Sequence, residues 1–186
     1  MHWEESLLAL FEDLEQQAEG LHLVERDAEV AERTRAEYAR VDFLSRVHAS
    51  LDGSVVLGVE GVGDVEGVLV RAGSDWCLVE SPGGQSWVVR LAAVTRARGL
   101  SGQALGESAR SPVTRLGLGS VLRGVADSRS PVLLHLCDAS RLRARLGRVG
   151  ADFVEVVPAY ADGGGAGVAA SVEVMPFRRL AAVRLL

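Results

Sequence analysis

Residues 53–91 read GSVVLGVEGVGDVEGVLVRAGSDWCLVESPGGQSWVVRL, and this stretch decides the fold. Short apolar runs alternate here with turn clusters such as residues 61–64 (Gly-Val-Gly-Asp) and residues 82–84 (Pro-Gly-Gly). Apolar runs of this length between glycine and proline clusters are typical of β-strands joined by tight turns. About four or five such strands in a short stretch predict a small, strongly bent sheet or barrel.

The first part of this unit recurs 77 residues later. Residues 132–136 read VLLHL where residues 55–59 read VVLGV. The turn glycine and the aromatic residue three positions after it are kept in both copies, as Gly73, Trp76, Gly150 and Phe153. A shared turn geometry and a shared core position would require this pair. The repeat predicts two copies of one barrel unit.

The end of the unit recurs at a different offset. Residues 88–94 align with residues 174–180 at an offset of 86, so an insertion must separate the two parts of the second copy. The insertion falls in residues 158–171, whose glycines and alanines are typical of a hairpin loop. A short helical pattern precedes each copy, around Leu44 and around Val121.

The N-terminal segment has a helical pattern. Leucine and phenylalanine recur at helical spacing between acidic residues, which predicts an amphipathic helix with a break near Gly20. The stripe consists of Leu7, Leu10, Phe11, Leu14 and Leu21. A second run, residues 28–47, continues it. The stripe either docks on a partner or a second copy, or packs on its own barrel.

These patterns predict four segments and a mainly β fold with an N-terminal α segment. Residues 1–50 form an acidic amphipathic helical segment, and residues 101–130 form a linker with a short helix. Residues 51–100 and 131–186 form two tandem five-stranded β-barrels, each preceded by a short helix. We expect the two barrels to have cores of their own.

Several of these features resemble the Sm-like (LSm) family. The matching residues are the stretch 67–69 (Gly-Val-Leu), the turn 73–75, Leu78, and the stretch 89–94. The resemblance implies an Sm-like or SH3-like five-stranded barrel in tandem, with the PRC-type barrel as a structural alternative. RNA-binding members have an asparagine in the third-strand turn, where this chain has Cys77 and Val154. The resemblance therefore favours the fold over the uridine pocket.

Charge is distributed unevenly along the chain. The net charge is −5, yet residues 1–50 hold 12 acidic residues and 5 arginines, and residues 101–186 hold 7 acidic residues and 11 arginines. All 20 basic residues are arginine, and lysine, asparagine and isoleucine are absent, which is typical of a GC-rich bacterium. The chain is also similar to actinobacterial proteins. The acidic N-terminus lacks the charge pattern of a signal peptide, so we expect a cytoplasmic protein.

The sequence contains no motif for catalysis or cofactor binding. Cys-x-x-Cys, His-Glu-x-x-His and Gly-x-Ser-x-Gly motifs are absent, and the glycine-rich stretch 61–67 lacks the lysine of a phosphate loop. His135 and Cys137 share a strand face, but two ligands do not make a zinc site. Cys77 and Cys137 are expected to be buried free thiols. We therefore expect no enzyme, no cofactor and no metal.

Arginines in the last third are the candidate binding residues. Alternation on a strand would project several of them from one face, where guanidinium groups can hold phosphates or simply keep a sheet edge solvated. The set is Arg141, Arg143, Arg145, Arg148, Arg178 and Arg179.

Two functions follow from the sequence. The first is a non-catalytic protein-binding or assembly module that self-associates through the N-terminal helix, as a homo-oligomer or with a protein partner. The second is an Sm-like RNA-binding protein that uses the arginines at 141–148.

Overall fold

The computed structural model describes residues 3, 26, 29–104, 112–159 and 171–186. The chain divides into two compact units, residues 1–41 and residues 42–186. The predicted helix break near Gly20 and most of the predicted loop at 158–171 lie outside the described residues. Among the helices that are described, none has the length and apolar character needed to cross a membrane.

The apolar run at residues 28–47 is not one helix. Residues 29–38 are helical, and α2 (Phe43–His48) begins after four residues that are not. Asp42 is the N-cap of α2: its backbone is extended, and its Oδ1 accepts a hydrogen bond from the backbone N of Ser45 at 2.6 Å. An extended N-cap satisfies a free amide of the new helix, so a preceding helix cannot continue through it.

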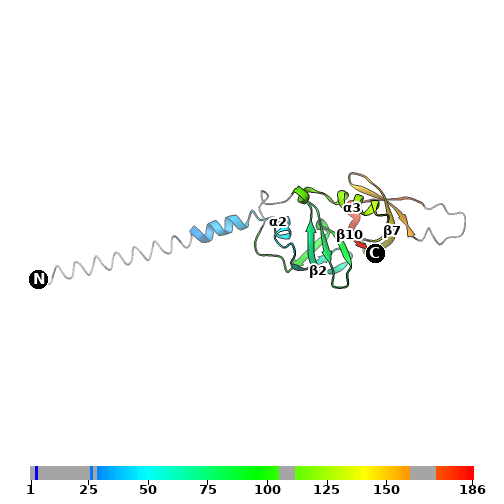
Figure 1. Ribbon diagram of the computed structural model, residues 1–186. Coiled ribbons are helices and arrows are strands. Elements are labelled where there is room, and N and C mark those ends of the chain that lie inside the picture. The colour runs from blue at the N-terminus through cyan, green and yellow to red at the C-terminus, as the bar shows by residue number, and fades with distance from the viewer. Residues whose placement is uncertain (1–2, 4–25, 27–28, 105–111, 160–170) are drawn as a thin grey trace. The chain divides into compact units, whose positions relative to one another are not determined.

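The second unit consists mainly of strands, and the prediction of a mainly β fold is confirmed (Figure 1). The strands of the first half are β1 (Ser54–Val59), β2 (Gly63–Ala72), β3 (Trp76–Glu80), β4 (Ser86–Arg90) and β5 (Val94–Arg98). Those of the second half are β6 (Pro131–Leu136), β7 (Arg141–Val149), β8 (Phe153–Pro158), β9 (Glu173–Pro176) and β10 (Leu180–Leu185). The remaining elements are α3 (Leu118–Asp127) and the 3-10 turns η1 (Leu91–Ala93), η3 (Pro112–Arg115) and η5 (Phe177–Arg179).

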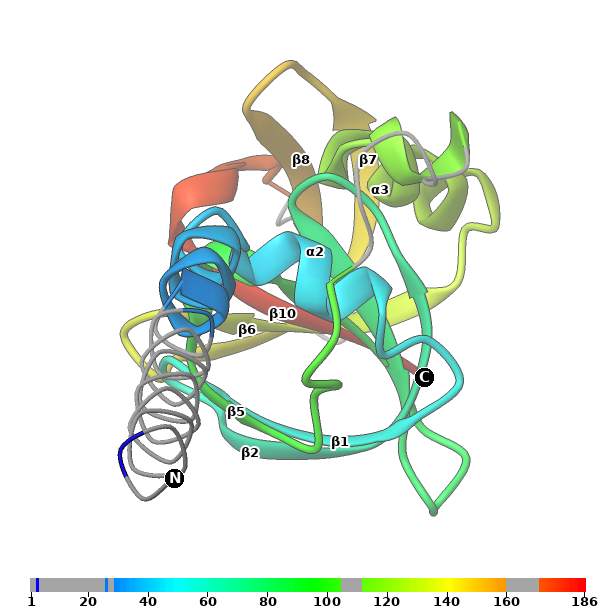
Figure 2. The same ribbon diagram turned by 90° about the vertical axis from the view of Figure 1, so that its left-hand side faces the viewer.

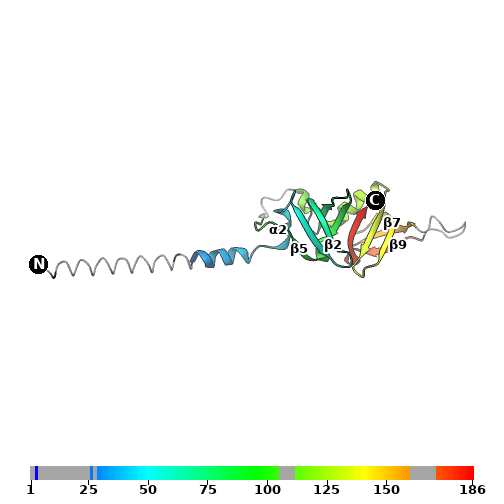
Figure 3. The ribbon, with the colours of Figure 1, turned by 90° about the horizontal axis from the view of Figure 1, so that it is seen from below.

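All ten strands belong to one antiparallel sheet, in the order β5-β1-β2-β3-β4-β10-β6-β7-β8-β9. The last strand of the chain, β10, lies between β4 and β6 and joins the two halves by backbone hydrogen bonds. Figure 3 shows β5 and β2 toward one end of the sheet and β7 and β9 toward the other. One continuous sheet departs from the prediction of two separate barrels, because separate barrels would share no ladder.

Strand order and register are nevertheless alike in the two halves. The first half runs β5-β1-β2-β3-β4, and the second runs β10-β6-β7-β8-β9. Val56 lies opposite Glu66 on one side, and Leu133, which is 77 residues later, lies opposite Arg143. On the other side, β1 pairs with β5 and β6 pairs with β10. Each of these two ladders has one register shift, between Gly58 and Val59 in β1 and between Leu180 and Ala182 in β10.

The turn before the third strand is closed in the same way in both halves. The backbone N of Gly73 donates to the carbonyl of Trp76 at 2.9 Å, and that of Gly150 donates to the carbonyl of Phe153 at 2.9 Å. A Cβ at Gly73 would lie 2.1 Å from Trp76 Nε1, and one at Gly150 would lie 2.3 Å from Phe153 Cε1. Glycine is needed here because an aromatic ring lies directly against its Cα.

The core forms two clusters that share strands. The first contains Val55, Leu57, Leu69, Cys77, Val79, Val89 and Ala182, and the second contains Trp76, Val88, Leu118, Leu122, Val132, Leu134, Val154 and Val183. Successive side chains of a strand point to opposite faces, so β3, β4 and β10 are buried on both faces. Each half therefore has a core cluster of its own, and β3, β4 and β10 contribute side chains to both clusters.

The aromatic residues that follow the turn glycine in the two halves do not occupy equivalent core positions. Trp76 is buried and belongs to the cluster of the second half, whereas Phe153 is only half-buried. The linker causes the difference: Trp76 Nε1 donates to the carbonyl of Leu116 at 2.8 Å. Asp75 Oδ1 accepts from the backbone N of Leu118 at 2.7 Å, at the start of α3. Figure 2 shows α3 beside β7 and β8, which it covers.

Candidate binding surfaces

β7 carries a row of arginines on its outer face. Arg141, Arg143 and Arg145 are exposed. Ala144, between two of these arginines, and Leu146, directly after the last of them, are buried in the core. A groove of about 550 Å³ lies along this row. Its other lining residues are apolar: Pro131, Leu142, Val157, Pro158 and Ala159. The alternation predicted from the sequence therefore places these three arginines together on one surface.

Arg148, Arg178 and Arg179 do not line this groove. The β7 ladder shifts register between Leu146 and Val149, and Arg148 there forms two hydrogen bonds to the carboxylate of Glu155, at 2.9 and 2.8 Å. These bonds lower the pKa of Glu155 and raise that of Arg148. Arg178 and Arg179 belong to η5, where Arg179 Nη2 lies 3.3 Å from Asp138 Oδ2. The groove on β7 therefore contains the three alternating arginines, and the other three candidates lie outside it.

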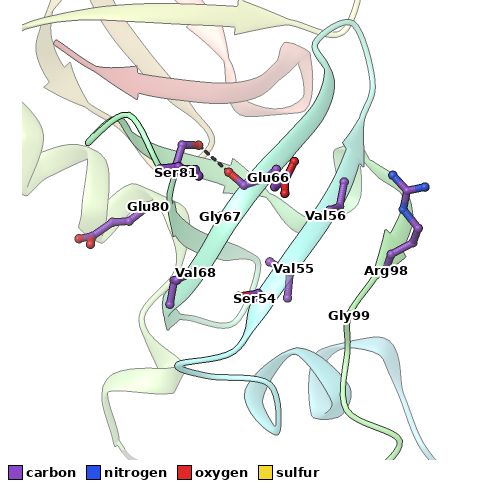
Figure 4. A pocket seen from close by; sticks show the side chains of 11 residues that line it. Ser54, Val55, Val56, Glu66, Gly67, Val68, Glu80, Ser81, Arg98 and Gly99 are labelled. Carbon is purple, nitrogen blue, oxygen red and sulfur yellow. Dashed lines mark hydrogen bonds between the residues drawn. The ribbon is translucent and has the colours of Figure 1, made fainter.

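The matching surface of the first half has the opposite charge. A groove of about 470 Å³ crosses β1 and β2, with Val56, Glu66, Val68 and Arg98 on it (Figure 4). Ser81 Oγ donates to the carbonyl of Glu66 at 2.7 Å along one side. Asp64, the residue in the place of Arg141, pairs with Arg96 at 2.7 Å and Arg98 at 3.4 Å. Reading the charges at the offset of 77 would have found this reversal from the sequence.

A buried histidine lies beside the joint between the halves. His135 is 3% exposed, and its ring centroid is 5.0 Å from that of Trp87 on β4. Arg184 lies over the same indole, 5.7 Å from its centroid. Neither ring nitrogen of His135 has a hydrogen-bond partner among the described residues. Burial, and then the charges of Arg141 and Arg184, lower the pKa of His135 to about 4, so the ring is neutral near pH 7.

The two cysteines differ in environment. Cys77 is fully buried, and burial raises the pKa of its thiol to about 12, so it stays a thiol. Cys137 is half-buried, and its Sγ accepts a hydrogen bond from Arg90 Nη2 at 3.5 Å. The described residues contain no group of three or more His, Cys, Asp and Glu side chains that would suit a metal ion.

Arg90 spans the joint between the halves. From β4, its Nε donates to the carbonyl of Leu180 at 2.6 Å, and its Nη2 donates to the carbonyl of Arg178 at 3.1 Å. Together with the Cys137 contact, these bonds tie β4 to the residues that lead into β10 and to the end of β6. Pro176 holds the same position in β9. Sequence reasoning gave Arg90 no such role, because its partners are backbone atoms from distant positions.

The predicted partner-binding stripe, with Leu7, Leu10, Phe11, Leu14 and Leu21, lies outside the described residues. Comparison with known proteins finds no family model and no curated protein that matches this chain.

Proposed function

We propose that this chain is a non-catalytic assembly module, built from two copies of one small Sm-like or SH3-like barrel unit. The repeated strand order and the matching registers support duplication. The main support for an assembly function is the joint at which β4 pairs with β10. It is a head-to-tail contact between two like units, and such a contact leaves one unused edge at each end.

The two unused edges are complementary. β5 pairs with β1 as β10 pairs with β6, so β5 has in the first half the place that β10 has in the second. Likewise β9 pairs with β8 as β4 pairs with β3, so β9 has the place of β4. No described strand covers the outer side of β5 or β9. An edge strand offers a row of free backbone donors and acceptors to another chain. A second copy can therefore add its β9 to β5, as β4 is added to β10 within the chain.

The residues on these edges suit this pairing. The internal register places Val88 opposite Val183 and Trp87 opposite Arg184. The same register between copies places Val174 opposite Ala97 and Glu173 opposite Arg98, which brings opposite charges together on neighbouring strands. Val174 is 61% exposed, whereas Val88 at the matching position is 2% exposed. Pairing with a second copy would give Val174 a partner strand.

Replacement of Val174 tests the edge contact. We expect wild-type protein to gain mass with concentration in sedimentation equilibrium, and Val174→Lys to gain less mass over the same concentrations, because a lysine blunts an edge strand. Val172→Lys is the matched control, since Val172 is 56% exposed but precedes β9. Equal masses for the two variants, or a wild type that remains a monomer throughout, would contradict the edge contact.

Self-association through the N-terminal helical segment is a separate part of the proposal. Its support is the apolar stripe in the sequence, where four or five buried side chains contribute about 1.5 to 3 kcal/mol each. Replacing Leu10 and Leu14 with Glu should lower the mass of the assembly while leaving the sheet folded. A variant that unfolds outright, or one with the mass of the wild type, would assign the stripe to internal packing.

RNA binding is the second candidate function, and the arginine groove on β7 favours it. It ranks second because Arg148 is engaged by Glu155 and no aromatic side chain among the described residues lines the groove for base stacking. A salt titration of poly(U) binding tests it, since each phosphate contact makes affinity fall steeply with salt. Binding that does not change with salt would exclude the arginine row as the RNA site.

A further inference from the structure

Arg141 and Arg143 give the groove on β7 a positive charge. None of the described residues that line it is acidic. Arg141 and Arg143 form no ion pair with any described residue. Two acidic groups from neighbouring segments are already engaged, Glu155 by Arg148 and Asp138 by Arg179 and Ser140. A row of guanidinium groups in this state attracts carboxylates or phosphates, with which each can form paired hydrogen bonds.

The strongest concentration of negative charge in the chain lies at its beginning. Residues 1–25 contain seven acidic residues and no arginine. Glu12, Glu15 and Glu19 follow one another at spacings of three and four. On the helix that the sequence predicts, these carboxylates would project from one side about 5 to 6 Å apart. Alternate arginines on a strand are about 7 Å apart, so the two rows match in both sign and scale.

We propose that the arginine groove on β7 holds the acidic N-terminal segment, residues 4–25, of a second copy of this chain. The inference rests on the proposed assembly function and names a second contact for it. The apolar lining of the groove, including Pro131, Val157 and Pro158, favours a peptide with leucines among its acids over a bare phosphate chain. The contact is between different surfaces of the two copies, and two copies that exchange segments would close a dimer.

Charge reversal on the two sides provides a test between copies. The groove variant is Arg141→Glu with Arg143→Glu, and the segment variant is Glu12→Arg with Glu15→Arg. In either variant alone, like charges face one another, so we expect the association constant to fall roughly tenfold or more. In an equimolar mixture, the reversed groove meets the reversed segment, and the two unreversed surfaces also meet. Sedimentation of the mixture should therefore recover the wild-type mass.

A charge-matched control separates the groove from net charge. Arg71→Glu with Arg123→Glu changes the charge by the same amount at exposed positions outside the groove. We expect this control to associate like the wild type, and the circular dichroism spectrum of every variant to be unchanged. Association that falls as far in the control as in the groove variant would overturn the proposal.

Other occupants of the groove give different results. If a single chain that carries all four reversals regains the wild-type mass while the mixture does not, the contact lies within one chain and the proposal is wrong. If the groove variant alone loses poly(U) RNA while the segment variant associates normally, the groove serves nucleic acid instead, and the proposal is again wrong.

The complementation experiment is repeated with Val174→Lys in both variants, to separate the groove contact from edge pairing. Recovery of a larger species by this mixture supports the groove contact without β9 pairing. If complementation fails in both backgrounds while Val174→Lys alone still lowers the mass of the wild type, the groove contact is excluded and edge pairing stands. If Val174→Lys has no effect while the mixture complements, edge pairing is excluded and the groove contact stands.

Discussion

Glu66 in the first half and Arg143 in the second occupy the same place in the sheet, opposite Val56 and Leu133. Both side chains lie on the outer face of their half, yet one groove is acidic on this row and the other is basic. Backbone pairing depends on inward-facing apolar residues, which both halves keep. Outer residues are free to diverge, because they do not contribute to either core.

The fourth strands of the two halves differ in what lies beside them. β4 has β10 on its outer side and Arg90 to secure that contact, whereas β9 has no described strand on its outer side and carries Pro176 in place of Arg90. Val88 is buried and Val174 is exposed for the same reason. Like units can thus have unlike surfaces when one is joined and the other ends the sheet. Matched substitutions in the two halves measure each difference.

The largest effect is expected where one half has a glycine and the other an alanine. Gly67 and Ala144 correspond, but a Cβ at Gly67 would lie 2.1 Å from the backbone oxygen of Glu80. We expect Gly67→Ala to lower the free energy of unfolding by more than about 3 kcal/mol, since backbone must move. Ala144→Gly should cost about 1 kcal/mol. Urea denaturation measures both, and equal losses would show that the two positions pack alike.

The next effect concerns the joint between the halves. Arg90→Ala removes the hydrogen bonds to the carbonyls of Leu180 and Arg178 and to Cys137 Sγ. Loss of these charged hydrogen bonds, one of them to the carbonyl of the buried Leu180, should cost about 2 to 3 kcal/mol in urea denaturation. Pro176→Ala, at the matching place, should change stability by less than about 1 kcal/mol. A harmless Arg90→Ala would mean that the ladder alone holds the joint.

His135 should make stability depend on pH, while Gly58 at the matching position cannot. The pKa of His135 is about 4 in the folded chain and about 6.5 when unfolded. The unfolded chain therefore takes up the proton first, and stability present above pH 6.5 is lost as the pH falls toward 4. Between about pH 7 and about pH 5 we expect a loss of about 2 kcal/mol in urea denaturation.

His135→Phe is the control for this pH dependence, because a phenyl ring keeps the contact with Trp87 and does not titrate. The carboxylates of Asp138 and Glu155 have lowered pKa values and stay ionised in this range. The part of the slope that comes from His135 should therefore disappear in the variant. An unchanged slope would assign the pH dependence to another group.

The smallest effect is expected at the turn that contacts the linker. Asp75→Ala removes the carboxylate that accepts from the backbone N of Leu118 at the start of α3, and should cost about 1 kcal/mol. The side chain of Asp152 at the matching turn contacts no helix start in the described residues, so Asp152→Ala should stay within about 0.5 kcal/mol. Thermal unfolding compares the two. Equal losses of stability in the two variants would show that the hydrogen bond from Leu118 to Asp75 does not stabilise the start of α3.

Strand positions followed from the sequence because local chemistry sets them. Glycine and proline clusters end the apolar runs at 53–91, and the glycine with its aromatic at Gly73 and Gly150 marks equivalent turns. The arginine row on β7 followed from alternation alone, because neighbouring residues of a strand point to opposite faces. The sequence grouped Arg148 with this row, and in the structure it pairs with Glu155 beyond the register shift between Leu146 and Val149.

By itself the sequence determined the strand-rich composition, the recurring order of strands and turns and the charge of each outer face, since all of these depend on residues near one another in the chain. Only the tertiary structure decided that β10 is inserted beside β4, that Trp76 is buried in the second cluster, and that His135 is enclosed without a partner. Each of these is a contact between residues separated by tens of positions. Backbone hydrogen bonds and packing, which carry no local sequence signature, select such contacts.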